Sequence, residues 1–510
     1  MKKTLAFMLL VLSVLTSFSQ SKGFYYNVMN TDTTSYPTIA TAAAETTGGD
    51  FLVFTTDFSS PGIIFRFSPN GEVEKMTELS YDGENALLFE LIPDPHDSSM
   101  FYGVCEMWDD AENEDGIALV HFDESLESIT FTPIDLPPEV GTIRVTASMI
   151  DSYDRFFVAA THYDPYGFPL YRGLVFMIIS LTGEVEKLTM TGNDFTCANT
   201  VFEFPGKAGT LGAYVSIYDQ IYCFDESLDF TIRELSTGQA VLEEPDSIFN
   251  HQVFIYNIEC GGLTVLPDGT FAICSAVLET WCRQGQYQPY KYDRSTALRW
   301  DDEGLEISQE RTLGNNICEM PAYYKCIDYK SPKSVYTCSF NESYIESGNL
   351  INQNGAVLVM KTNQDMEKVW DKAFYLGPYV YFATSILATS DGGCLVVGRS
   401  SEDPGGWNEK MGFFVLKINE DGSLGTNEVI TADRETIFAY PNPFKENITL
   451  IGEQIAEVRL YSITGQLVAT KQGEGTESLT VDISDLPSGL YFVTAIGKDG
   501  RKCVQKVVKQ

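Results

Sequence analysis

The chain has 510 residues, a formal net charge of -37 at pH 7 and 44% hydrophobic residues, so it is long enough for more than one domain with its own core. The acidic residues are spread over the whole chain, which argues against nucleic acid or an anionic membrane surface as a partner. The 11 cysteines are an odd number, so in an exported chain at least one has no intramolecular disulfide partner.

The N-terminus has the features of a secretory signal peptide. Two lysines precede an apolar run over residues 5–15, and small residues follow at the positions that a signal peptidase reads. We therefore predict a signal peptide over residues 1–19, with Gln20 as the first mature residue. The alternative is a membrane anchor, which needs about 20 apolar residues. No other apolar run reaches membrane length, so no membrane span is expected after signal removal.

Residues 24–430 repeat one pattern of strands and turns. Each repeat has an apolar strand, a short turn with Asp, Gly or Pro, a second apolar strand, a variable loop, a third strand and a turn of the Asp/Asn-x-x-Gly or Asp-Glu-Ser-Leu type. The first repeat is clearest at residues 48–73 and the last at 391–422. Five more lie between them at a spacing of roughly 50 to 64 residues. Their second strands begin near Met100, Phe156, Leu211, Phe271 and Val335.

Seven such units predict an all-β fold, a seven-bladed β-propeller over residues 24–430. The alternative is a pair of β-sandwiches, but sandwich strands do not normally recur as one matched unit over a whole domain. The stretch after Gly422 is short for a full outer strand. We therefore expect residues 24–28 to join the last blade and close the ring.

The two sides of this propeller differ in their connections. The turns between first and second strands and between third and fourth strands lie on one side and are short, as at residues 69–71 and 182–183. The connections between second and third strands lie on the other side. They are long and span residues 105–115, 162–169, 281–290, 339–355 and 400–411.

Aromatic residues on the long connections are the candidate ligand-binding residues. Their rings can stack on sugar faces or hold peptide side chains. The alternative is that these rings only seal the loops onto the rim of the propeller. The candidates, with one arginine among them, are Trp108, Tyr163, Tyr166, Phe168, Trp281, Arg283, Tyr290 and Trp407.

Motifs for catalysis and metal binding are absent from the sequence. The four histidines, His96, His121, His162 and His251, are expected in separate blades, and no spacing typical of zinc ligands or of a nucleophile elbow occurs. An enzyme remains an alternative, in which two carboxylates, or an acid with His162 or His251, meet at the central opening. No cofactor is expected. Calcium would suit an acidic exported protein, but residues 109–116 and 419–422 lack the first carboxylate ligand of a calcium loop.

The last part of the chain predicts a second, smaller domain. After a linker over residues 431–436, the segment 437–510 alternates apolar and polar residues as strands of a half-buried sheet do. The inward residues are expected to include Ile448, Leu450, Val458, Leu460, Leu479, Val481, Ile483, Phe492, Thr494 and Ile496. Turns are expected at 464–465, 473–475, 487–489 and 498–500. The pattern favours a small Ig-like antiparallel β-sandwich.

This segment also resembles a known family. Tyr440-Pro-Asn-Pro-Phe444, the run around Tyr461 and Gly465, the LPSGLYFV stretch and the basic end are together similar to the type A C-terminal sorting domain of the bacterial type IX secretion system. The resemblance covers about the last seventh of the chain. The residues expected to form the sorting signal are Pro441, Asn442, Pro443, Gly465, Gly489 and Tyr491. The alternative is an ordinary terminal Ig-like module that is never cleaved.

The resemblance implies a destination. A Gram-negative cell would export the chain through the periplasm to the outer cell surface or the medium, with the type IX machinery and its sortase-like surface protease as partners. The propeller would then bind an extracellular glycan or protein. The alternatives are a secreted glycoside hydrolase or lyase that uses paired carboxylates, and a structural surface protein.

Overall fold

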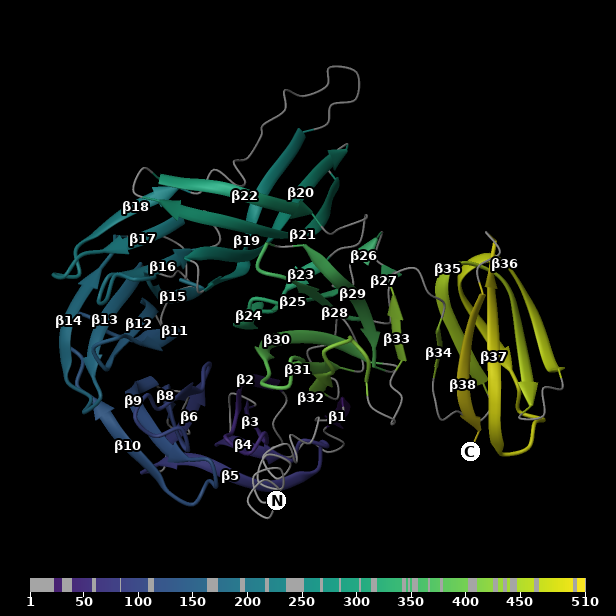
Figure 1. The fold of residues 1–510 in the computed structure, drawn as a ribbon, viewed down its shortest axis with the longest axis horizontal. Helices are drawn as coiled ribbons and strands as arrows, with labels where there is room; N and C mark the ends of the chain where they lie inside the picture. Colours follow the sequence, from purple (N-terminus) through teal and green to yellow (C-terminus); the bar gives the residue numbers. More distant parts are fainter. Residues whose placement is uncertain are drawn as a thin grey trace, which may run out of the picture.

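The structure is a computed structural model of the chain. It describes residues 23–509 except the segments 30–38, 57–60, 83, 109–113, 163–172, 193–197, 216–219, 235–251, 267–268, 284–285, 302–303, 313–318, 342–344, 347–348, 351–355, 366, 377–378, 402–410, 425–429, 434–437, 441–446, 463–466 and 499–501. The described elements are strands, and those paired in sheets run antiparallel. Figure 1 shows the sheets arranged in a ring, which is the propeller-like arrangement that the repeats predict.

The first two repeats share one nine-stranded sheet. The edges of the two repeats are joined by the pairs Ser80↔Asn85 and Tyr81↔Glu84. The strands are β2 (Ile39–Glu45), β3 (Phe51–Thr56), β4 (Gly62–Phe67), β5 (Val73–Tyr81), β6 (Glu84–Leu88), β7 (Ile92–Pro93), β8 (Met100–Trp108), β9 (Glu114–Asp123) and β10 (Ile129–Ile134).

The next three repeats form four-stranded meanders, each with strands in sequence order. They comprise β11 (Ile143–Ile150), β12 (Arg155–His162), β13 (Leu174–Ser180) and β14 (Val185–Met190), then β15 (Thr200–Glu203), β16 (Leu211–Val215), β17 (Gln220–Phe224) and β18 (Phe230–Glu234), and then β19 (Gln252–Val265), β20 (Thr270–Arg283), β21 (Gln286–Asp301) and β22 (Gly304–Thr312). The expected second strands therefore start where the sequence places them.

The sixth repeat has an additional outer strand. Its sheet contains β23 (Glu319–Pro321), β24 (Ile327–Ser331), β25 (Ser334–Asn341), β28 (Val357–Thr362), β29 (Lys368–Tyr375) and β33 (Ile430–Asp433), and a small hairpin of β26 (Ile345–Glu346) and β27 (Asn349–Leu350) is separate. Because β33 pairs with β29, residues 431–433 of the expected linker are part of a sheet edge. The other domain boundaries stay predictions.

The N-terminal strand completes the last sheet. This sheet has the order β1 (Phe24–Met29), β32 (Met411–Ile418), β31 (Cys394–Ser401) and β30 (Val380–Ala388). Phe24 pairs with Lys417 and Val28 pairs with Phe413, so the predicted closure of the ring by residues 24–28 is confirmed. The number of blades, seven, stays a prediction.

The short connections share one turn geometry. In the first repeat, the Ser68 amide donates to the Glu72 carbonyl, and Gly71, with φ 85°, donates to the Ser68 carbonyl. This is a type I turn followed by a left-handed residue. The Asp-Glu-Ser-Leu turns place Leu126 (φ 57°) and Leu228 (φ 67°) at that left-handed position. Both leucines are buried, and their burial offsets the steric cost of the backbone.

The core lies between neighbouring sheets, and each sheet contributes from both faces. In β31, Cys394 and Val396 pack into the core shared with the sixth repeat, whereas Leu395 and Val397 pack into the core shared with the first. A strand buried on both faces needs a nearly continuous apolar run. This explains why the second and third strands were the clearest signals in the sequence.

The C-terminal segment folds around a core of its own. Its five-stranded sheet contains β34 (Phe438–Tyr440), β35 (Asn447–Ser462), β36 (Leu467–Asp482), β37 (Gly489–Gly497) and β38 (Lys502–Lys509), which Figure 1 shows in yellow-green and yellow. The register of β35 against β36 shifts between Ile451 and Ile455. The core of this domain includes Ile448, Leu450, Val458 and Leu460 of β35.

Two details of this domain differ from the predictions. The expected turn at 473–475 lies inside β36, where the register against β35 shifts between the pairs Ile455↔Thr476 and Glu457↔Gln472. A Cβ at Gly473 would come within 2.4 Å of the Ile455 carbonyl oxygen, so glycine allows this close approach. The inward phase of β37 is also shifted by one residue. Tyr491, Val493 and Ala495 are buried, instead of the predicted set that includes Thr494.

Candidate functional site

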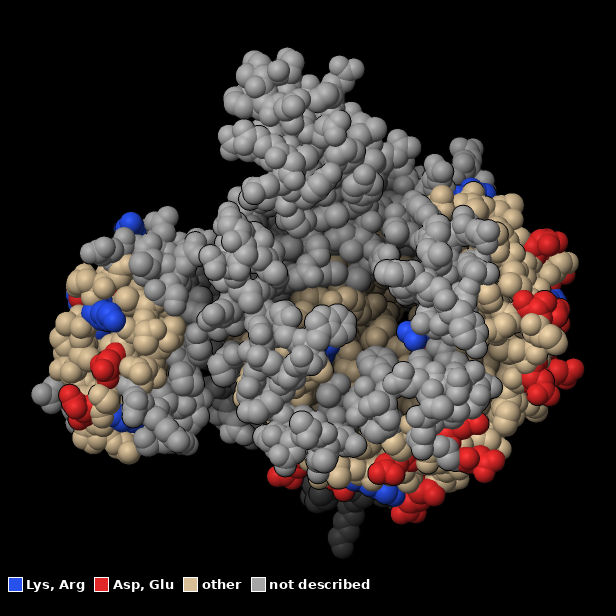
Figure 2. All heavy atoms as spheres, turned by 180° about the vertical axis from the view of Figure 1, so that it is seen from behind, with Lys and Arg blue, Asp and Glu red and all other residues tan. Residues whose placement is uncertain are grey.

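An axial cavity of about 470 Å³ lies where the innermost strands of the propeller meet. Its wall is formed by β2, β11, β15, β19, β24, β30 and the segment around β7, so residues from all parts of the ring come together. Figure 2 shows a hollow at the centre of the ring, with Lys or Arg atoms inside it. The volume lies in the range of roughly 300–1,000 Å³ that is typical of small-ligand pockets.

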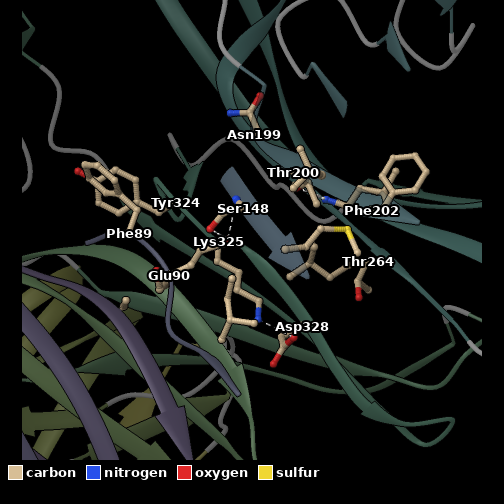
Figure 3. Close-up of a pocket in the computed structure, with 18 of the residues that line it drawn as sticks. Phe89, Glu90, Ser148, Asn199, Thr200, Phe202, Thr264, Tyr324, Lys325 and Asp328 are labelled. Carbon is tan, nitrogen blue, oxygen red and sulfur yellow. Dashed lines mark hydrogen bonds and ion pairs between the residues drawn. The ribbon is translucent and has the colours of Figure 1, made fainter. Parts of the chain in front are cut away.

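Glu90 is an acidic group in the cavity wall (Figure 3). Its Oε2 accepts hydrogen bonds from the backbone amide and the hydroxyl of Ser148 in β11, at 2.8 and 3.1 Å. Burial raises the pKa of the Glu90 carboxyl, although Lys325 and the two Ser148 donors act in the opposite direction. Because both bonds use Oε2, Oε1 can accept a hydrogen bond from a ligand.

Lys325 provides a cation in the same wall. Its Nζ lies 2.9 Å from Oδ1 of Asp328, and Oδ2 of Asp328 accepts the Ala388 amide at 2.6 Å. Burial lowers the pKa of Lys325, but the Asp328 and Glu90 carboxylates outweigh this effect and raise the pKa overall. The Lys325 side chain remains 39% exposed, so its ammonium can donate to a bound molecule as well as to Asp328.

Two aromatic rings adjoin these charged groups. Phe89 and Tyr324, the chain neighbours of Glu90 and Lys325, have ring centroids 4.7 Å apart, and Figure 3 shows the rings side by side. Thr200, Thr264 and Asn199 add neutral polar groups to the lining. The cavity therefore combines apolar ring surface, a carboxylate and an ammonium. Among the described residues, no cluster of three or more His, Cys, Asp or Glu could hold a metal ion.

Two of the six residues predicted to form the sorting signal, Gly489 and Tyr491, are among the described residues. Gly489 begins β37, and the buried Tyr491 donates its hydroxyl to the Pro487 carbonyl at 2.7 Å. Pro441, Asn442, Pro443 and Gly465 lie outside the described residues. Residues 438–510 match the family model described as "Secretion system C-terminal sorting domain".

The tail is a type IX sorting domain. Such a domain directs a protein to the outer cell surface or to the medium, so this chain is exported and interacts with the type IX secretion machinery. The described residues contain no helix that is long and apolar enough to span a membrane. Cleavage of the sorting domain by a surface protease stays a prediction.

The exported chain is similar to several solved structures. Virginiamycin B lyase from Staphylococcus aureus is 12% identical with a TM-score of 0.42, and the match covers 78% of this chain and 100% of the lyase. Polysaccharide lyase Uly1 is 11% identical with a TM-score of 0.40, covering 75% and 90%. The PQQ-bound aldose sugar dehydrogenase from Streptomyces coelicolor is 12% identical with a TM-score of 0.33, covering 78% and 99%. Likeness at this level carries no argument about function. No curated protein matches the chain.

The aromatic candidates lie largely outside the described residues. Tyr163, Tyr166, Phe168 and Trp407 fall in segments 163–172 and 402–410, so their role stays a prediction. The prediction of a long loop at 281–290 is wrong, because β20 and β21 remain paired as far as Arg283↔Gln286. The backbones of Trp108, Trp281, Arg283 and Tyr290 belong to strands, and their side chains are outside the described part of the structure.

The histidines are placed differently from the prediction. His96 and His121 both belong to the second repeat, since β7 and β9 are in the same sheet. His121 Nε2 lies 3.0 Å from Oδ2 of Asp94, and its ring stacks on Tyr102 at 4.0 Å. None of the cavity-lining residues is a histidine. His162 ends β12, and His251 lies outside the described residues.

The sequence predictions missed the charged residues of the cavity. Glu90 lies between β6 and β7, and Lys325 lies two residues before β24. A charged residue next to an innermost strand is a signal that could have drawn attention to them, because this strand borders the axis. Their closeness to Ser148 and Asp328 depends on the closed ring.

Proposed function

We propose that this exported protein binds an extracellular saccharide in the axial cavity of its propeller. The observation that carries the proposal is the combination of the Phe89 and Tyr324 rings with Glu90 and Lys325 in one cavity of ligand size. A sugar ring has an apolar face that packs on aromatic rings, and its hydroxyls both donate and accept hydrogen bonds. Glu90 and Lys325 supply the matching acceptor and donor.

The long connections would extend this site outward. Tyr166 and Trp407 on the long connections and Trp281 in β20, with the other aromatic candidates, remain proposed contacts for further sugar units. A purely structural role for the cavity groups is the competing explanation, because Glu90 binds Ser148 of a neighbouring repeat and Asp328 binds Ala388 of another. A structural role does not require the half-exposed Lys325 ammonium or the two adjoining rings to face the cavity.

A glycan array probed with residues 20–510, followed by calorimetry on any hit, tests the proposal. We expect Tyr324→Leu to weaken binding by roughly threefold to tenfold, because one aromatic contact is lost. Tyr81→Leu is the matched control. Tyr81 is 38% exposed in β5, the outer strand of the first repeat, and is not one of the residues that line the cavity, so its loss should leave binding unchanged.

The outer contacts are tested separately. The combined variant Tyr166→Ala, Trp281→Ala and Trp407→Ala should weaken binding of longer saccharides more than that of a disaccharide. If the folded variant lost no more affinity for longer saccharides than for a disaccharide, these three aromatic residues would not be part of the binding site. An array without any saccharide hit would refute the proposed function itself.

A second candidate is a saccharide-cleaving enzyme. The observation that favours it is the raised pKa of Glu90 in a cavity that also contains Asp328, since a protonated acid near a carboxylate can serve acid and base roles. Binding is preferred because both carboxylates already accept structural hydrogen bonds. Release of shorter products from a bound saccharide, abolished by Glu90→Gln, would decide for the enzyme.

A further inference from the structure

Arg399 differs from the other arginines whose contacts are described in the propeller repeats. Arg66 donates to Oδ2 of Asp50, with Nε at 2.9 Å, and Arg155 donates to Oδ2 of Asp151 with Nε at 3.0 Å. Among the described residues, Nε of Arg399 is buried without a hydrogen-bond acceptor. One terminal nitrogen of Arg399 contacts the thioether sulfur of Met411, which is a weak acceptor.

The surroundings of Arg399 are aromatic. Its guanidinium carbon lies 5.8 Å from the ring centre of Phe382, its direct cross-strand partner. The Phe382 ring is 5.5 Å from Phe340, and Phe340 is 5.3 Å from Tyr323, which is 37% exposed. We call Arg399, Phe382, Phe340 and Tyr323 the Arg399 cluster. It joins two adjacent repeats.

The Arg399 cluster borders the axial cavity. Tyr323 directly precedes Tyr324 and Lys325, which line the cavity, and its amide donates to the Ala383 carbonyl next to Phe382 at 3.3 Å. Arg399 is near the end of β31, at the side where the long connection 402–410 follows. A ligand that extends from the cavity past Tyr324 would therefore meet this cluster at Tyr323.

A guanidinium in this setting is suited to an oxyanion. Arginine stays charged at neutral pH and presents donors in a planar fork that fits a carboxylate or sulfate. Burial lowers the pKa of Arg399, because the guanidinium is partly removed from water. An anion that reaches the terminal nitrogens of the guanidinium would be a stronger acceptor than the Met411 sulfur. The overall charge of -37 opposes an anion at long range, but this repulsion is screened beyond about 10 Å at 0.1 M salt.

We propose that the Arg399 cluster binds the anionic group, a carboxylate or a sulfate, of an acidic saccharide whose ring packs on Phe382 and Tyr323. This inference rests on the proposed function and names its ligand class. Arg399 is thereby a specificity residue for an acidic sugar, next to a cavity that holds a neighbouring unit. Phe340 is fully buried and supports the Phe382 ring from behind.

Three oligosaccharide probes of equal length test the inference. They are an oligogalacturonate, its methyl ester, in which the carboxylates are neutral, and a sulfated galactose oligosaccharide, each titrated into residues 20–510. We expect an anionic probe to bind more tightly than the methyl ester. Arg399→Met should remove that preference, with a roughly tenfold to hundredfold loss for the anionic probe and little change for the ester. The probe that shows the preference identifies carboxylate or sulfate as the source.

A second variant, Arg399→Lys, and thermal melting of each variant distinguish loss of binding from loss of folding. Lysine retains the charge but not the fork, so it should keep part of the preference even if Arg399→Met folds poorly. If a folded Arg399→Met loses affinity equally for anionic and neutral probes, Arg399 is only structural and the inference is overturned. Equal binding of all three probes by the native protein overturns it too, while the proposed function survives. If none of the saccharides binds, the proposed function fails and the inference falls with it.

Discussion

The short-turn end of the propeller and its axial region use polar groups in different ways. At the short-turn end, carboxylates are bonded to the turns: Asp151 holds Arg155, and Asp391 holds the buried Lys417 at 2.9 Å. In the axial region, Lys325 is half-exposed, and Arg399 has a buried Nε without an acceptor among the described residues. The polar groups of the short-turn end stabilise the fold, whereas those of the axial region can still form hydrogen bonds with a ligand.

Contacts between neighbouring repeats strengthen this contrast. Glu45 accepts both the amide and the hydroxyl of Ser390, at 2.7 and 2.6 Å. Glu203 likewise accepts both donors of Ser152, at 3.1 and 2.7 Å. In each case a carboxylate of one repeat fixes the short turn of the repeat before it around the ring. Since repeats that contact only their neighbours depend on such interfaces, these contacts hold neighbouring repeats together, and Glu203 is also one of the residues that line the axial cavity.

The largest expected effect at the short-turn end is that of Asp391→Ala. Lys417 has a fully buried side chain, and removal of its partner would leave an uncompensated charge, which costs about 3–5 kcal/mol. Chemical denaturation measures this loss. Saccharide binding by the folded fraction should not change. The double variant Asp391→Ala with Lys417→Met should recover much of the stability, and a failure to recover would show that the ion pair is not the cause.

A smaller effect is expected from the contact between Glu203 and Ser152. Ser152→Ala removes one hydroxyl donor from a solvent-accessible carboxylate and should lower the free energy of unfolding by about 1 kcal/mol. A double-mutant cycle with Glu203→Gln isolates the coupling between the two residues. Glu203 also lines the cavity, so saccharide binding is measured alongside stability. If Ser152→Ala weakened binding without lowering stability, this contact would serve the ligand site through Glu203, and the division between the two parts of the propeller would be wrong.

The sequence predicted the parts of the fold that repeat. The apolar second and third strands and the Asp/Asn-x-x-Gly and Asp-Glu-Ser-Leu turns follow from local patterns. Closure by residues 24–28 follows instead from the short stretch after Gly422, which leaves the last repeat without a full outer strand. The phase of β37 and the continuity of β36 through Gly473 could not be predicted, because they depend on which neighbouring strand approaches the backbone.

The axial site was less predictable for a related reason. Glu90 and Ser148 are 58 residues apart in the sequence, and Lys325 comes from a repeat that is distant in the chain. Only the radius and register of the closed ring bring them together. The aromatic side chains chosen from the long connections are conspicuous in the sequence, whereas single charged residues in inner strands are not.

The smallest expected effect is a change in how the free energy of unfolding depends on pH, and it tests Glu90 in the axial region. Because the pKa of Glu90 is raised in the folded protein, the native state retains a proton that the unfolded chain has already lost. Stability should therefore fall as the pH rises from the ordinary glutamate value to the raised one. Glu90→Gln should flatten this part of the profile.

Lys325→Met should have the opposite effect on the same profile. The Lys325 cation lowers the pKa of Glu90, so its removal should raise that pKa further and extend the pH range over which stability falls. Melting temperatures measured from pH 4 to pH 8 check this. An unchanged profile in Lys325→Met would mean that the two charges do not interact across the cavity. The saccharide would then meet two independent groups instead of one coupled donor and acceptor.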